Sequence, residues 1–130
     1  MKYVTSDIHG CYEELIELLQ LIHFSEKDFL YIIGDAIDRG TESIKTLKKI
    51  MSMKNVELLM GNHEEFFLEG LKEELEGRAG YVSKELWLQH GGDTTYQQFQ
   101  ALEKEEKQEI IDYLKHRPLY KILGNIVLVH

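Results

Sequence analysis

Short apolar runs alternate with longer segments of helical periodicity along the first 75 residues. The run from Phe29 to Ile33 is continuously apolar and ends at Gly34, as expected for a strand buried on both faces of a sheet. The helical segments space their apolar residues three and four positions apart. We predict strands over 1–6, 29–33 and 56–60, and helices over 13–22, 41–53 and 64–75. Strands that alternate with helices indicate an α/β fold with a largely parallel sheet.

The segment from 75 to 115 differs in character from the first half of the chain. We expect it to be wholly helical, with glycines as breaks and a charged stretch over 103–109 that is typical of a solvated helix face. We interpret residues 65–117 as the approximate extent of a helical insertion packed beside the sheet. Pro118 ends the last helix, and residues 119–130 are expected to form one or two further strands.

Composition limits the classes of function. The 130 residues include 15 basic and 23 acidic side chains, a formal net charge of -8, which disfavours nucleic acid and anionic membrane as partners. The single Cys11 cannot form an intramolecular disulfide, and the sequence shows neither a secretion signal nor an apolar run long enough to span a membrane. We therefore expect a cytoplasmic protein that binds neither nucleic acid nor membrane.

Polar side chains follow each of the three predicted strands. The first strand is followed by Asp7-Ile-His-Gly10, the second by Gly34-Asp-Ala-Ile-Asp-Arg-Gly40 and the third by Gly61-Asn-His-Glu64. Ligands of open α/β sheets bind outside the carboxyl ends of the strands. We therefore expect all three motifs to meet at one rim of the sheet.

Five side chains suit divalent metal ions. Asp7 and His9 are two residues apart and point the same way in an extended chain, Asp35 can bridge two cations, and Asn62 can offer a neutral amide oxygen. His130, after the last apolar run, is placed to bind the second cation. This set predicts two divalent metals about 3.5 to 4 Å apart that activate a water molecule. Manganese is the preferred ion, with iron, zinc or cobalt as alternatives.

Three further side chains are suited to phosphate binding and proton transfer. Arg39 offers a planar fork of donors matched to phosphate oxygens. His63 can protonate a leaving alkoxide as general acid, while Asp38 fixes the tautomer of His63 and raises its basicity. We assign catalysis to His63 and Asp38, and substrate binding to Arg39 and Asn62. The reaction this set predicts is phosphate ester hydrolysis.

The three motifs resemble the signatures of the phosphoprotein phosphatase family of calcineurin-like metallophosphoesterases, written DxHG, GDxVDRG and GNHE, and only Ile37 departs from them. The segment Trp87-Leu-Gln-His-Gly-Gly92 is similar to the bacterial and phage branch that includes lambda phosphatase. The resemblance implies a metallophosphoesterase β-sandwich flanked by helices (αββα), with residues 1–130 as the N-terminal half of a single domain. It also implies that one metal is bound by Asp7, His9 and Asp35, and the other by Asp35, Asn62 and His130.

The catalytic domain of that family continues past the position of His130. The resemblance implies that the continuation supplies another metal-binding histidine, a second phosphate-binding arginine and the other half of the sandwich. We therefore expect the 130-residue chain to be a truncated part of a longer phosphatase, weakly active or inactive by itself. Apolar surface that the missing half would cover favours self-association of such a fragment.

Three functions stay open. The main hypothesis is a serine/threonine protein phosphatase acting on phosphoprotein, because Asp38 before Arg39 and Glu64 after His63 resemble that branch. The alternative is a symmetrical diadenosine tetraphosphate hydrolase acting on a small phosphoester, which shares the sheet and the metals. The third is a noncatalytic module that binds metal or phosphate. Retention of His63 and Asp38 argues against this module, because a pure binding site needs no general acid.

Overall fold

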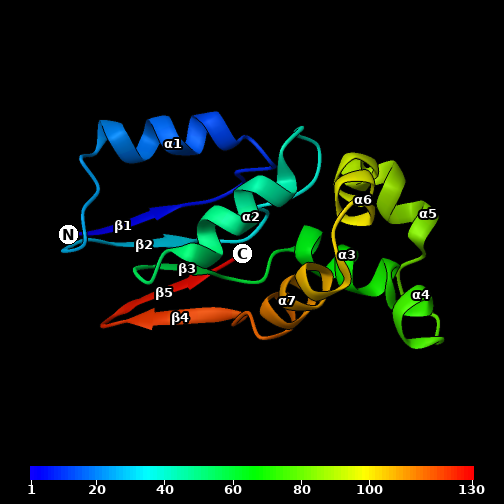
Figure 1. The fold of residues 1–130 in the computed structure, drawn as a ribbon. Helices are drawn as coiled ribbons and strands as arrows, with labels where there is room; N and C mark the ends of the chain where they lie inside the picture. The colour runs from blue at the N-terminus through cyan, green and yellow to red at the C-terminus, as the bar shows by residue number, and fades with distance from the viewer.

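The computed structural model describes all 130 residues, and its framework is a three-stranded parallel sheet (Figure 1). The strand order is β1-β2-β3, with Lys2 opposite Phe29 and Leu30 opposite Val56. The helices between the strands, α1 and α2, contact each other on one side of this sheet. The elements of this layer are β1 (Lys2–Thr5), α1 (Tyr12–Leu21), β2 (Phe29–Ile32), α2 (Ser43–Ser52) and β3 (Val56–Leu58). The predicted α/β class and the parallel sheet are confirmed.

The central strand β2 is covered on both faces, as its continuous apolar sequence predicts. Leu30 and Ile32 belong to the main hydrophobic core that the strands form with the helices. Tyr31, which points to the opposite face of the sheet, packs with Leu59 and Leu128 in a second and smaller cluster. Burial of such side chains stabilises the fold by about 1.5–3 kcal/mol each.

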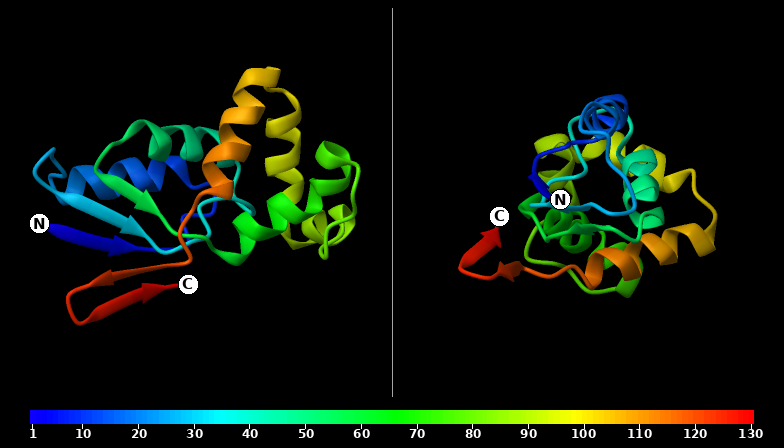
Figure 2. Two further views of the ribbon diagram at one scale, coloured as in Figure 1. Left: turned by 90° about the horizontal axis from the view of Figure 1, so that it is seen from below. Right: turned by 90° about the vertical axis from the view of Figure 1, so that its left-hand side faces the viewer.

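Leu128 comes from a β-hairpin that begins a second layer against the parallel sheet. Its strands are β4 (Tyr120–Leu123) and β5 (Ile126–Val129), which pair antiparallel with Tyr120 opposite Val129. The hairpin lies on the side of the sheet away from α2, as the end-on view of Figure 2 shows. Its last strand brings His130 back toward the carboxyl ends of the parallel strands.

The remaining helices gather beyond the carboxyl ends of the parallel strands (Figures 1 and 2). The segment expected to be helical with glycines as breaks is interrupted at such glycines, since residues 77–83 are not helical and the chain kinks at His90 and Gly91. Aromatic rings of Phe67, Trp87 and Phe99 pack edge to face in its core. The helices are α3 (Asn62–Gly70), α4 (Lys72–Glu76), α5 (Lys84–Trp87), α6 (Asp93–Gln100) and α7 (Lys104–Lys115), with a π-helical turn over Leu88–Gly92. None of the chain's helices combines the length and apolar character needed to cross a bilayer.

Candidate metal and phosphate centre

The loops after β1 and β2 have an unusual backbone conformation. Six non-glycine residues of the chain have positive φ angles, and all but His23 are among the predicted site residues. Left-handed backbone is costly for residues with a side chain and is concentrated at functional sites in folded proteins. The five site residues are Asp7 (φ 54°), His9 (φ 47°), Asp35 (φ 56°), Asp38 (φ 73°) and Arg39 (φ 71°).

His9 has the tautomer that a metal ligand needs. Its Nδ1 lies 2.9 Å from the carbonyl oxygen of Ile37, so Nδ1 bears the proton and donates it to that carbonyl. Its Nε2 therefore presents a lone pair, 3.6 Å from Oδ1 of Asp7 and 3.8 Å from Oδ2 of Asp35. Three acceptor atoms facing one another repel unless a cation lies among them, so this donor set fits a divalent metal.

A second group of polar atoms meets at the same carboxylate. His130 Nε2 lies 3.1 Å from Oδ2 of Asp35, and the Asn62 side-chain oxygen faces both oxygens of that carboxylate. Swapping the Asn62 amide would turn these contacts into hydrogen bonds of 3.1 and 3.2 Å, and a cation bound between the oxygens would stabilise the unswapped orientation instead. The structure thus brings together all five predicted ligands, and Asp35 is common to both groups.

Ligand atoms also approach one another across the two groups. Asp7, Asp35 and His130 each present an atom within 4.8 Å of the others, and so do His9, Asp35 and His63. The carboxylate of Asp35 is the member that both sets share, and its side chain is only 6% exposed. Asp35 therefore lies at the centre of the candidate site.

Glu64 stabilises the backbone of the loops that carry these ligands. Its carboxylate accepts the backbone N–H of Asp35 at 2.6 Å, that of Ala36 at 3.0 Å and that of Gly61 at 3.0 Å. Burial raises the pKa of Glu64 to about 7, although the three N–H donors oppose that rise. Glu64 therefore joins the loop after β2 to the start of α3 and faces inward.

Replacing Glu64 by alanine should destabilise the fold. Three buried N–H groups would lose their acceptor, at about 1–3 kcal/mol for each buried unsatisfied group. We expect the free energy of unfolding, measured by urea denaturation, to fall by about 3 kcal/mol or more, given those costs. Glu109→Ala, at an exposed position of α7, is the matched control and should change it by less than about 0.5 kcal/mol. A loss below about 1 kcal/mol for Glu64→Ala would contradict this stabilising role.

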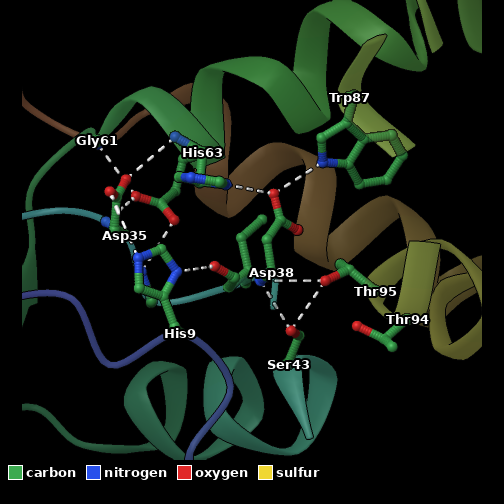
Figure 3. A network of polar contacts seen from close by, with 12 residues as sticks. His9, Asp35, Asp38, Ser43, Gly61, His63, Trp87, Thr94 and Thr95 are labelled. Carbon is green, nitrogen blue, oxygen red and sulfur yellow. Dashed lines mark hydrogen bonds and ion pairs between the residues drawn. The ribbon is translucent and has the colours of Figure 1, made fainter. Parts of the chain in front are cut away.

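His63 and Asp38 form the predicted pair (Figure 3). Nδ1 of His63 lies 2.8 Å from Oδ2 of Asp38, and both side chains are almost fully buried, at 2% and 0% exposure. The hydrogen bond to Asp38 raises the pKa of His63, while burial works in the opposite direction. The ring of His63 stands edge-on to that of His9 at 4.9 Å between centroids, so its free Nε2 belongs to the same site.

Asp38 is itself held by residues that sequence reasoning missed. Its backbone N–H donates to the hydroxyls of Ser43, at 2.9 Å, and Thr95, at 3.2 Å. The indole N–H of Trp87 donates to Oδ2 of Asp38 at 2.9 Å (Figure 3). A buried tryptophan N–H usually finds a partner, but no local pattern in the sequence shows which acceptor it meets across 49 positions.

Arg39 has an exposed side chain, as do Asp7, Asn62 and His130 in the same site. Its guanidinium forms no ion pair in the chain, while its backbone N–H donates to the carbonyl of Gly91 at 2.8 Å. The positive charge lies close enough to His63 to oppose the rise in the pKa of that residue. Arg39 therefore has free donors beside the general-acid candidate, as an anion-binding residue requires.

Comparison with known proteins identifies the class to which this fold and site belong. The sequence model of the calcineurin-like phosphoesterase family matches residues 3–128. The chain belongs to this family, and the metallophosphoesterase fold expected from the sequence is confirmed. The candidate ligands for divalent metals therefore lie within a domain of the calcineurin-like phosphoesterase family.

More specific likenesses are to symmetrical bis(5'-nucleosyl)-tetraphosphatases. The chain is 31% identical over 133 residues to the protein of that name from Nitrosospira multiformis and 34% identical over 130 residues to the one from Methylobacillus flagellatus. Each match covers 98% of this chain and 42% of the relative, so the chain spans about two fifths of their length. A solved structure provisionally described as a diadenosine tetraphosphatase has the same fold, with a TM-score of 0.67 at 21% identity, over 98% of this chain and 53% of that one.

These likenesses overturn the main functional hypothesis from the sequence. The motifs favour a serine/threonine protein phosphatase over a diadenosine tetraphosphate hydrolase, but the full-chain relatives carry the hydrolase name. The physical reason for the error lies in the two residues that decide the choice. Asp38 and Glu64 are fully buried, and they contact His63 and backbone N–H groups rather than the open side of the site. They hold the site in shape, and neither distinguishes one substrate from another.

Proposed function

We propose that the full-length protein hydrolyses dinucleoside polyphosphates symmetrically, at a centre of two divalent cations. The observation that supports this most is that four predicted ligand side chains meet around a fifth, Asp35, in a chain whose relatives, matched over 98% of its length, are named tetraphosphatases. Manganese is our preferred ion, with iron, zinc or cobalt as alternatives, because carboxylate, imidazole and amide ligands together suit borderline metals.

The residues would divide the work as follows. Asp7, His9 and Asp35 would hold one cation, and Asp35, Asn62 and His130 would hold the other. When bound, two such cations supply a water nucleophile at neutral pH and offset the charge of the phosphoryl oxygens. The left-handed backbone at Asp7, His9 and Asp35 is the kind of strained conformation that folded proteins keep at binding sites.

Arg39 and His63 act on the substrate directly. The exposed Arg39 fork binds the non-bridging oxygens of the phosphoryl group that is attacked. The water oxygen forms a bond to phosphorus, and the bridging P–O bond breaks with its electron pair left on the departing oxygen. His63 Nε2 gives its proton to that oxygen, and Asp38 stabilises the imidazolium beforehand through Nδ1. The proton released by water passes to solvent or returns to His63, so the cycle closes.

Replacing Arg39 by lysine tests its part in this scheme. Lysine keeps the positive charge but loses the planar fork, so we expect kcat/KM for diadenosine tetraphosphate to fall about tenfold, and further with alanine. Arg78→Lys, at an exposed arginine that pairs only with Glu76, is the matched control and should leave kcat/KM unchanged. Equal activity of wild type and Arg39→Lys would show that Arg39 acts only as a point charge.

Product analysis tests the proposed substrate. We expect the manganese-loaded full-length protein to convert diadenosine tetraphosphate to ADP alone, since symmetrical cleavage leaves two phosphates on each nucleoside. A phosphoserine peptide at equal concentration is the comparison and should be cleaved much more slowly. AMP and ATP as products would contradict symmetrical cleavage, and faster hydrolysis of the peptide would reject the nucleotide substrate.

A further inference from the structure

The Asp38 carboxylate accepts a hydrogen bond from a second donor besides His63. Nε1 of Trp87 lies 2.9 Å from Oδ2 of Asp38, the same oxygen that lies 2.8 Å from Nδ1 of His63. Figure 3 shows the indole and the imidazole approaching this oxygen together. Trp87 and Asp38 are completely buried, so both hydrogen bonds are shielded from water and strengthened by their surroundings.

No other group restrains the Asp38 carboxylate. Its Oδ1 is buried and has no hydrogen-bond partner, and the hydroxyls of Ser43 and Thr95 hold only its backbone N–H. A partial rotation about Cβ–Cγ would turn Oδ2 away from His63, because the torsion next to a carboxylate is soft. The indole N–H, fixed within the aromatic core, opposes this rotation.

The chain around Trp87 is shaped to keep the indole in place. A Cβ atom on Gly92 would overlap the indole ring at its nitrogen, so only glycine allows the π-helical turn to close over it. The preceding Gly91 has a φ of 96°, and its carbonyl accepts the backbone N–H of Arg39. One short segment thus contacts both Asp38 and the proposed phosphate-binding residue. Phe67 and Tyr96 pack edge to face on the indole from other directions.

We infer that Trp87 is a positioning residue for the general acid: its indole N–H fixes the Asp38 carboxylate, so that His63 Nε2 stays directed at the leaving oxygen. This inference rests on the proposed function only in requiring phosphoester hydrolysis with His63 as acid, and it does not depend on a nucleotide substrate. Trp87 itself touches neither the candidate metal ligands nor the exposed side of the site. Its effect should therefore depend on how much protonation the leaving group needs.

Trp87→Phe, which removes the N–H and keeps an aromatic ring, tests this in the full-length manganese-loaded protein. With phenyl phosphate, whose leaving group needs a proton, we expect kcat to fall about tenfold, a part of the roughly 10²–10⁴ typical of general acid catalysis. With 4-nitrophenyl phosphate, whose leaving group is stable as an anion, the fall should stay below about threefold, and KM should not change for either. Phe99→Leu, in the same aromatic core but without contact to Asp38, is the control and should affect both substrates equally.

NMR supplies a readout that does not depend on turnover. In the wild type we expect the Trp87 indole proton to be shifted downfield and to exchange slowly, and to move when Asp38→Asn removes the negative charge. This measurement stands even if Trp87→Phe fails to fold. An equal loss of kcat on both aryl phosphates in Trp87→Phe would overturn the inference. So would an indole proton signal that does not move in Asp38→Asn. Aryl phosphatase activity without diadenosine tetraphosphate cleavage would reject the proposed substrate and leave the inference intact.

Discussion

Asp35→Asn should reduce activity by about a thousandfold or more, since metal ions contribute several kcal/mol of charge stabilisation in the transition state. The Asp35 carboxylate is shared by both groups of candidate ligands, so the substitution weakens both cation sites at once. The amide keeps the size of the side chain and can still accept the backbone N–H of His63, which lies 3.1 Å from Oδ1. We therefore expect a folded protein that binds fewer divalent ions, as measured by metal analysis after dialysis against manganese.

Asp93→Asn is the matched control for Asp35→Asn, because Asp93 lies at the start of α6, away from the ligands. It should retain wild-type activity and the wild-type content of metal. If Asp35→Asn kept both cations and more than about a tenth of the wild-type kcat, the bridging role of Asp35 would be excluded.

His63→Asn should lower kcat by about 10²–10⁴ on substrates with poor leaving groups, which is the usual contribution of a positioned general acid. The loss should be much smaller with 4-nitrophenyl phosphate, whose leaving group departs without a proton. Metal content should change little, because Nδ1 of His63 is engaged by Asp38 and five other side chains form the ligand groups.

His116→Asn controls for the loss of an imidazole elsewhere. His116 is exposed beyond the end of α7, and its Nδ1 lies 2.7 Å from the carbonyl of Asp112. This variant should behave as wild type with both substrates. An equal loss on good and poor leaving groups in His63→Asn, together with a loss of bound metal, would mean that His63 is a ligand rather than the acid.

The parallel sheet and the position of the site follow from the sequence because local signals agree there. The continuous apolar run over 29–33 identifies a strand buried on both faces, and the polar motifs directly after the strands identify the rim. The carboxyl ends of parallel strands must lie together, so the sequence alone predicts that Asp7, Asp35 and Asn62 meet. Their side chains do meet, around the carboxylate of Asp35.

The residues that support the site could not be predicted in the same way. Trp87, Ser43 and Thr95 reach Asp38 from helices that lie apart in the sequence, and only tertiary packing decides which buried donor meets which acceptor. Gly77 and Gly80 mark the break over 77–83 in the sequence, but they do not show how many residues leave the helical conformation. The sequence motif suggests that Glu64 indicates the substrate. In the structure its carboxylate instead accepts hydrogen bonds from three backbone N–H groups.

The central claim is that the strand ends hold two divalent cations that share Asp35. A crystal structure of the full-length protein grown with manganese, with anomalous scattering recorded for that metal, tests it most directly. We expect two anomalous peaks about 3.5 to 4 Å apart, as in two-metal hydrolases, with Asp35 between them. Asp7 and His9 should contact one peak, and Asn62 and His130 the other. A single peak, or peaks that Asp35 does not touch, would contradict the account.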